Sequence, residues 1–320
     1  MKTKKILIIG SKENFTLEKM YYRAFINLGQ NVEFYHIHDS INSKILNLIE
    51  RLFRFYIYKK RRKILLNFIK KKKLDLIIFI KIKRSQPGVK IVNIFPDNPL
   101  DIKRKNISNI NVLECIDQFD LFCIWSNRIL KEIKFLKKKA KLLYLPFAHD
   151  KFFHIKGKID PRYKNKINFI GSFDKSRLDI LKQLDSSNIL IGGNNWKHKI
   201  RNYGRHIYGR KLCSIISSSL ASLNFLRDQN LTSHNMRTFE VPAMKGLLLT
   251  QRSKEQNQFF PEGKASLMFS NLKELKNQIA YIKKNPKKAL KIRLNSYRIS
   301  KKHSYTHRAK SILKKLYYDL

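Results

Sequence analysis

The chain alternates between short apolar runs and longer segments with helical periodicity. Residues 6–9 are all apolar and end at Gly10, which is typical of a buried parallel strand. In residues 16–28 the apolar positions recur at helical spacing and stop at Gly29, and residues 32–36 are strand-like again. This strand–helix–strand unit predicts the beginning of a doubly wound sheet.

The same alternation runs twice along the chain. Further strands are predicted at residues 74–80, 89–95, 119–125, 141–145, 167–170, 189–191, 221–226, 247–250 and 266–269. We therefore predict an α/β protein with two Rossmann-like doubly wound domains. The predicted boundaries are 1–150 for the N-terminal domain, 151–166 for a polar linker and 167–303 for the C-terminal domain. A C-terminal helix at 304–320 could pack back on the N-terminal domain.

The stretch from residue 233 to residue 250 is the most informative one. Ser233 is a good N-cap, so a helix is predicted at about residues 233–244, with Pro242 affecting its last turn. A strand, a polar loop and a helix N-terminus form an anion site, because free amides and the helix dipole point to one place. Arg237 can add a phosphate contact, and Glu240 lies on a neighbouring part of the same face. The alternative is an ordinary surface Arg–Glu pair.

Composition changes this picture only in part. The 320 residues include 68 Lys and Arg against 23 Asp and Glu, a net charge of +45. Such a charge favours polyanionic partners, but Lys, Ile and Asn all have A+T-rich codons, so codon bias accounts for much of it. The sequence has no helix-turn-helix or zinc spacing. A nucleic-acid partner is therefore the weaker alternative.

A basic segment at residues 45–73 is predicted to be helical. It contains the runs 59–63 and 70–73, which we interpret as a solvated face. The alternative is a membrane-lipid surface with Phe53, Phe55, Tyr56 and Tyr58 on its apolar side. Peripheral contact with an anionic membrane is kept as a candidate interaction on this basis.

The cysteines and the N-terminus bear on the location of the protein. Cys115, Cys123 and Cys213 fit no metal-ligand spacing and are interpreted as reduced thiols, so no metal site is predicted. The apolar run at residues 6–9 is too short for a signal peptide, and no run approaches the length of a membrane span. We expect a cytoplasmic protein, with a peripheral position at the inner face of the membrane as an option.

An ordered series of short motifs in the second half resembles the CgeB-like (spore-protein type) glycosyltransferases, a branch of the GT-B enzymes related to family 4. The matching pieces are residues 167–172 with Arg177, Tyr208, residues 222–226, residues 235–243 with Gly246, residues 259–264, residues 272–275 with Tyr281, and residues 303–308. The resemblance covers residues 167–313 and is only architectural in the first half.

The resemblance implies a GT-B fold, in which two Rossmann-like domains face each other across a cleft. It implies a glycosyltransferase that needs no metal and no cofactor. The N-terminal domain would bind a glycan, lipid-linked or protein acceptor, and the C-terminal domain a nucleotide-diphosphate sugar. The implied donor-binding residues are Gly171, Ser172, Arg177, Tyr208, Asn224, Ser233, Asn235, Arg237 and Glu240. Glu240 matches the carboxylate that accepts hydrogen bonds from the donor ribose.

The sequence departs from the related pattern at two positions. Thr232 stands where related family-4 enzymes carry the first of two Glu residues, and Lys245 stands where close relatives often carry Gly. A non-catalytic relative that binds a sugar nucleotide or a glycan is therefore an alternative.

An inverting enzyme would need a general base near the acceptor. Asp97, directly after a predicted strand, is the candidate, with Glu13 and His149 behind it. The alternative for Asp97 is an ordinary exposed turn. His303 and Arg308 are interpreted as structural.

Overall fold

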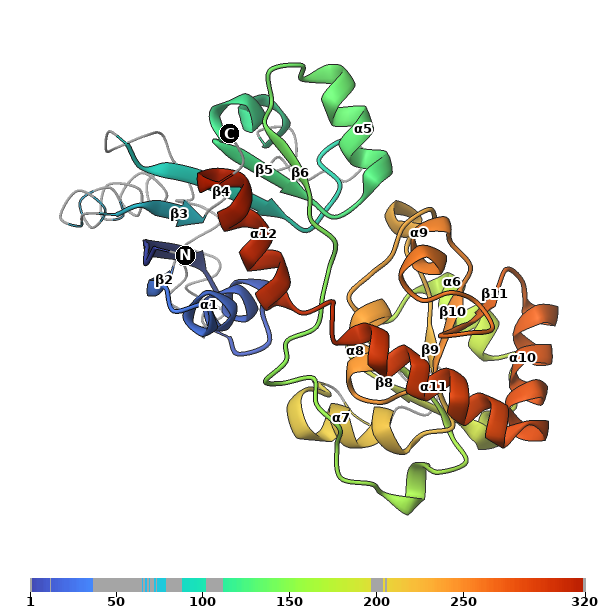
Figure 1. The fold of residues 1–320 in the computed structure, drawn as a ribbon. Coiled ribbons are helices and arrows are strands. Elements are labelled where there is room, and N and C mark those ends of the chain that lie inside the picture. Colours follow the sequence, from blue (N-terminus) through green and yellow to red (C-terminus); the bar gives the residue numbers. More distant parts are fainter. Residues whose placement is uncertain are drawn as a thin grey trace, which may run out of the picture. The chain divides into compact units, whose positions relative to one another are not determined.

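The computed structural model of the chain contains two α/β units (Figure 1). It describes residues 2–11, 13–36, 65, 67, 69, 72, 74–78, 88–101, 112–196, 204 and 206–318. The first unit comprises Met1–Leu145 with Ala309–Leu320, and the second comprises Pro146–Arg308.

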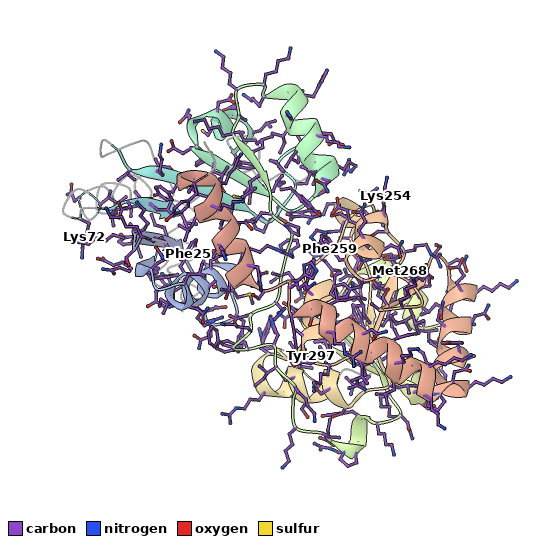
Figure 2. All side chains as sticks on the ribbon, viewed as in Figure 1. Phe25, Lys72, Lys254, Phe259, Met268 and Tyr297 are labelled. Carbon is purple, nitrogen blue, oxygen red and sulfur yellow. The ribbon has the colours of Figure 1, made fainter. Side chains whose placement is uncertain are left out.

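The first unit is built on a parallel sheet of six strands in the order β2-β1-β3-β4-β5-β6. The strands are β1 (Lys5–Gly10), β2 (Asn31–His36), β3 (Leu76–Ile78), β4 (Lys90–Phe95), β5 (Leu121–Ile124) and β6 (Leu142–Tyr144), and the helices are α1 (Leu17–Asn27), α5 (Asn127–Leu136) and the end of α12 (Tyr305–Tyr317). β1 is almost wholly buried, as an all-apolar run in the interior of a parallel sheet requires, and α1 packs against it. Phe25 of α1, labelled in Figure 2, is fully buried.

The second unit has a parallel sheet of five strands in the order β11-β10-β9-β7-β8. Its elements are β7 (Ile167–Ile170), α6 (Lys175–Leu181), β8 (Ile189–Gly192), α7 (Gly209–Ser218), β9 (Ala221–Asn224), α8 (Arg237–Ala243), β10 (Leu248–Gln251), α9 (Lys254–Phe259), β11 (Leu267–Phe269), α10 (Leu272–Lys284) and α11 (Pro286–Ser300). One core cluster joins the sheet to α6, α10 and α11, and the other joins it to α7 and α8. Apolar side chains thus cover both faces, as a buried parallel sheet requires.

Both sheets follow the same winding rule. Numbered within each unit, the strand order begins 2-1-3-4-5, so the order reverses between β1 and β3 in the first unit and between β7 and β9 in the second. Ligands of open α/β sheets bind beyond the carboxyl ends of the strands at this switch point. The topology therefore predicts a ligand site at the carboxyl edge of each sheet, next to its switch point.

The helix predicted at residues 233–244 begins later than expected. α8 comprises Arg237–Ala243, its N-cap position is Met236, and Pro242 lies inside it. Ser233 is not the N-cap, because its hydroxyl donates to Glu255 and its carbonyl accepts from the hydroxyl of Ser253. The prediction of the N-cap was wrong because these partners lie about twenty residues further along the chain.

Lys245 follows α8 in a conformation that favours glycine. Its φ is 55°, in the left-handed region. A residue in this conformation is strained unless it is glycine, so Lys245 is a position that glycine would suit better.

The predicted linker and the predicted basic helix have different outcomes. The segment predicted as a linker, residues 151–166, belongs to the second unit, where the amides of Gly157 and Asp160 donate to Ser217 and Ser218 of α7. The basic runs at 59–63 and 70–73 and the aromatic cluster at residues 53–58 lie outside the described residues, apart from Lys72. The interpretation of residues 45–73 stays a prediction.

Candidate functional site

Arg177 joins the two loops at the switch point of the second sheet. Its Nη1 donates to the carbonyl of Ser172 (3.1 Å) and its Nη2 to the carbonyl of Phe225 (3.5 Å), which follow β7 and β9. The guanidinium lies 5.6 Å from the ring centroid of Phe169. Burial lowers the pKa of this guanidinium. Arg177 therefore holds the shape of the edge at which a ligand would bind.

Arg237 and Glu240 lie beside the same loop. Arg237 is the first residue of α8, and its Nε donates to the carbonyl of Ile170 (3.3 Å), next to Gly171. Its Nη1 forms an ion pair with Glu240. The side chain of Arg237 is 25% exposed and that of Glu240 only 4%. The guanidinium thus keeps an accessible part, whereas the carboxylate lies beneath it.

Glu240 is held in its ionised form mainly by Arg237. Burial by itself raises the pKa of a carboxyl group, but the charge and the hydrogen bond of Arg237 oppose this effect, and the pKa of Glu240 is lowered. Nε2 of His154 lies 3.6 Å from Oε1 of Glu240, and its Nδ1 accepts the amide N–H of Asp150 (2.9 Å). A neutral His154 therefore carries its proton on Nε2, toward Glu240.

Glycines allow a close backbone approach at this edge. The amide of Gly171 donates to the carbonyl of Gly192 (2.9 Å), and the carbonyl of Gly171 accepts from Nε1 of Trp196 (2.8 Å). Gly193 has a φ of 127°, and a Cβ there would lie 2.2 Å from the oxygen of Gly171. A larger residue at position 193 would push this loop away.

The amide side chains of Asn224 and Asn235 form a reciprocal pair. Each Nδ2 donates to the other's Oδ1, at 3.1 Å and 2.9 Å. Asn224 is buried and lies within reach of Thr250 and Gln256. Both predicted residues therefore lie at the carboxyl edge, where their side chains build a polar network that fixes the loop before α8.

Ser233 lies in a second buried cluster below this loop. Its hydroxyl and Nδ1 of His234 both meet Oε2 of Glu255, the latter at 3.0 Å. Nε2 of His234 accepts the amide N–H of Phe147 (3.2 Å), so its Nδ1 carries the proton. The cluster anchors the approach to Arg237. Sequence reasoning missed Glu255 and Gln256, although Ser253-x-x-Gln256 is a capping-box signal for α9.

The remaining predicted residues have different surroundings. Tyr208 occupies the N-cap position of α7 and is 44% exposed, and Thr232 is exposed in the loop before Ser233. Arg308 donates to the carbonyls of Pro146 (2.9 Å) and Phe147 (3.1 Å), and its guanidinium lies over the ring of Phe239. These contacts agree with a structural role for Arg308.

The three candidates for a general base do not share one environment. Asp97 follows β4 in the first unit and is half-buried, and Glu13 is exposed before α1. His149 belongs to the second unit, where its Nε2 lies 3.1 Å from the carbonyl of Ser300. Burial and the neighbouring His154 lower the pKa of His149 to about 4. A neutral His149 therefore contacts the backbone of α11.

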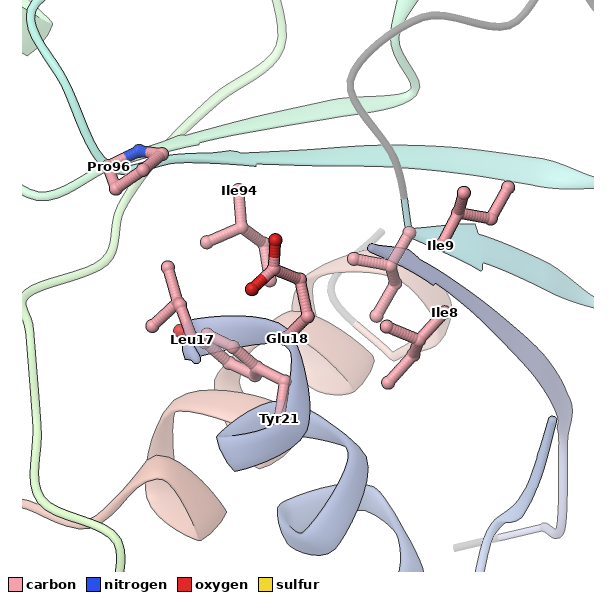
Figure 3. A pocket seen from close by; sticks show the side chains of 8 residues that line it. Ile8, Ile9, Leu17, Glu18, Tyr21, Ile94 and Pro96 are labelled. Atoms are coloured by element: carbon pink, nitrogen blue, oxygen red, sulfur yellow. The ribbon is translucent and has the colours of Figure 1, made fainter. Parts of the chain in front are cut away.

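A pocket of about 110 Å³ opens at the switch point of the first sheet (Figure 3). Its lining is mostly apolar, with Glu18 as its one charged residue, and consists of Ile8, Ile9, Leu17, Glu18, Tyr21, Ile78, Ile94 and Pro96. Glu18 belongs to the first turn of α1 and points among these apolar side chains. Sequence reasoning missed Glu18, although an acidic residue at the start of the first helix after β1 was a usable signal.

The second unit is expected to lose stability as the pH falls below about 6.5, which is well above the pH at which carboxylates titrate. Burial lowers the pKa of His149 and of His303 to about 4, helped for His303 by the charge of Arg308. In the unfolded chain both rings titrate near pH 6.5. Between pH 6.5 and about 4 the unfolded chain binds protons that the folded chain does not, so stability falls as the pH falls.

We expect a loss on the order of 4 kcal/mol between pH 7 and pH 4.5 in urea unfolding curves. The variant His303→Gln should flatten this profile. The lowered pKa of Glu240 adds a further loss only below about pH 4, because that carboxylate stabilises the fold while it is ionised. A profile without slope between pH 7 and pH 4.5 would contradict the assignment.

In the part of the chain that the structure describes, no group of three or more His, Cys, Asp or Glu side chains is placed to hold a metal ion. Within the same residues, no helix combines the length and the apolar character needed to cross a membrane.

Comparisons with known proteins place this geometry in context. Residues 176–314 match the model of a family described as glycosyl transferase-like. A search of the curated proteins gives no match.

Among solved structures, sucrose-phosphate synthase from Thermosynechococcus elongatus has a TM-score of 0.69 at 10% identity, with 98% of each chain covered. HepE from Anabaena in complex with UDP and glucose has a TM-score of 0.66 at 10% identity, covering 99% of this chain and 100% of the other. A TarM mutant from S. aureus in complex with fondaparinux, alpha-GlcNAc-glycerol and UDP has a TM-score of 0.60 at 10% identity, covering 81% and 59%. The prediction of two parallel-sheet α/β domains of the GT-B type is confirmed.

Proposed function

We propose that this chain transfers a sugar from a nucleotide-diphosphate donor to an acceptor. The match of residues 176–314 to a glycosyl transferase-like family and the GT-B fold support this proposal. The proposed reaction is a hexosyl transfer of the CgeB-like type that uses neither a metal ion nor a cofactor. The acceptor would be a glycan, a lipid-linked glycan or a protein, in the assembly of a cell-surface polysaccharide. We propose a cytoplasmic location for it.

The donor half of this proposal depends on one observation. Arg237 lies against the carboxyl end of β7, beside Gly171, and forms an ion pair with the buried Glu240. A guanidinium can stabilise the negative charge that develops on a departing diphosphate, and a preorganised group does so without further reorganisation. An ionised carboxylate accepts hydrogen bonds from vicinal hydroxyls, such as those of a ribose. The pair therefore suits a nucleoside diphosphate.

The acceptor half is proposed for the first unit. Its pocket combines apolar walls with the carboxylate of Glu18, and among the described residues none forms an ion pair or hydrogen bond with that carboxylate. Glu18 is our candidate for the group that takes the proton from an acceptor hydroxyl, and Asp97, one residue after the pocket wall at Pro96, is the second candidate. Both lie at the carboxyl edge of the sheet.

Thermal-shift screening with nucleoside diphosphates and nucleotide sugars tests the proposal. We expect one nucleoside diphosphate to raise the melting temperature. At a hundredfold excess over its Kd, such a ligand increases the free energy of unfolding by about 2.7 kcal/mol. Release of that diphosphate from its sugar in the presence of an acceptor extract then measures transfer. Glu18→Gln should leave the thermal shift unchanged and reduce transfer about 100-fold, and Asp97→Asn serves as the matched comparison.

The exposed Thr232, which replaces a Glu of related enzymes, favours one second candidate. A relative that binds a sugar nucleotide without turnover would show the thermal shift and no release of diphosphate with any donor. The absence of a shift with every nucleotide would contradict both functions.

A further inference from the structure

The C-terminal end of α5 exposes two large apolar side chains. Phe135 is 80% exposed and Leu136 is 57% exposed. α5 packs on its own unit through Ile129 and Ile133, which are fully buried. Phe135 follows Ile133 by two positions, about 200° around the helix, so it lies on the outward face. Packing within the first unit therefore does not explain why a large apolar side chain stands at position 135.

Lysine side chains surround these two residues. Residues 128–141 contain seven basic residues and a single acid. That acid, Glu132, pairs with Arg128 at 2.7 Å, and the nearby Asp117 pairs with Lys137 at 3.6 Å. Neither carboxylate is left to offset the exposed lysines. We define the α5 tip as Phe135, Leu136 and the exposed Lys131, Lys134, Lys138, Lys139 and Lys141.

We propose that the α5 tip docks this protein on an anionic membrane surface. Lysines next to a membrane are attracted by anionic headgroups, and their long side chains reach the phosphates while apolar neighbours enter below them. Phe135 and Leu136 would gain by leaving water for the headgroup boundary. This surface differs from the one predicted at residues 45–73.

The apolar pair decides between a membrane and a nucleic acid. Binding to a phosphate backbone uses the lysines alone and leaves Phe135 and Leu136 in water. An anionic membrane uses both kinds of side chain at once. The two ligands therefore respond differently to removal of the apolar pair.

Co-sedimentation of the full chain with phospholipid vesicles tests the proposal. We expect binding to phosphatidylcholine vesicles that contain phosphatidylglycerol, weaker binding at high salt, and none to pure phosphatidylcholine. The variant Phe135→Ser with Leu136→Ser should reduce the partition coefficient at least about tenfold. Ile26→Ser is the matched control, because Ile26 is 46% exposed on α1 of the same unit and should leave binding unchanged.

Two further variants test the proposal without removing the apolar side chains of the α5 tip. Lys134→Gln with Lys138→Gln and Lys139→Gln should weaken binding and reduce its dependence on salt. Phe135→Trp should show a blue shift in fluorescence with the anionic vesicles and quenching by brominated lipids.

Three results would overturn the proposal. They are full vesicle binding by the double Ser variant, equal binding to neutral vesicles, and binding to a DNA duplex without binding to vesicles. Both Ser changes are at exposed positions, so the melting temperature of the double variant should equal that of the unchanged protein. A lower melting temperature would reveal a folding defect.

Discussion

Replacement of Arg237 by Met is expected to lower the free energy of unfolding of the second unit by about 3 kcal/mol and to weaken nucleoside diphosphate binding by about 1.5–3 kcal/mol. The first effect arises because Glu240, 4% exposed, keeps its charge but loses the partner that contributes most to its low pKa. The second arises because the guanidinium that would meet the diphosphate is gone. Urea unfolding and calorimetric titration with UDP and GDP measure the two effects separately.

A double variant separates stability from donor binding. Replacement of both members of a buried ion pair by apolar residues of similar volume often costs little, so Arg237→Met with Glu240→Met should recover most of the lost stability. It should not recover affinity for the nucleotide. Arg162→Met is the matched control, because Arg162 is 79% exposed in an ion pair with Asp160 of the same unit. Unchanged nucleotide affinity in the single variant would remove Arg237 from the proposed site.

Glu255→Ala is expected to cost about 3 kcal/mol of stability and to loosen the loop that carries Arg237. Its Oε2 accepts from the hydroxyl of Ser233 and from Nδ1 of His234, and both donors are completely buried. The change would remove the acceptor that both donors share. Nδ1 of His234 still faces the hydroxyl of Ser233 at 3.1 Å, so one of the two buried donors loses its acceptor, at about 1–3 kcal/mol, in addition to the loss of packing. Nucleotide affinity should fall as well, because Ser233 and His234 lie in the approach to α8.

Two companion variants test the reason for this loss. Glu255→Gln keeps one acceptor oxygen and should cost clearly less than Glu255→Ala. Glu262→Ala removes a carboxylate of the same unit from a surface ion pair with Arg252, and should cost less than about 1 kcal/mol. Equal losses for Glu255→Ala and Glu262→Ala would show that the buried cluster does not anchor the loop.

The sequence by itself determined the parallel α/β architecture. All-apolar runs such as residues 6–9 and 167–170 can be buried on both faces only within a parallel sheet, and the helical periodicity of residues 17–27 supplies the covering layer. It also placed Arg237 and Glu240 three positions apart, so their pairing on one face of α8 followed from helix geometry alone. These inferences need only neighbours along the chain.

Tertiary structure decided which of these polar groups remain available to a ligand. Ser233 could not be recognised as a buried anchor, because its partner Glu255 lies 22 positions away on a helix that the sequence reasoning missed. His154 approaches Glu240 from 86 positions away, and Glu18 enters a pocket whose walls come from three separate strands. Local periodicity fixes which face of an element is apolar, but the burial and pairing of a charge depend on the segments that the fold brings against it.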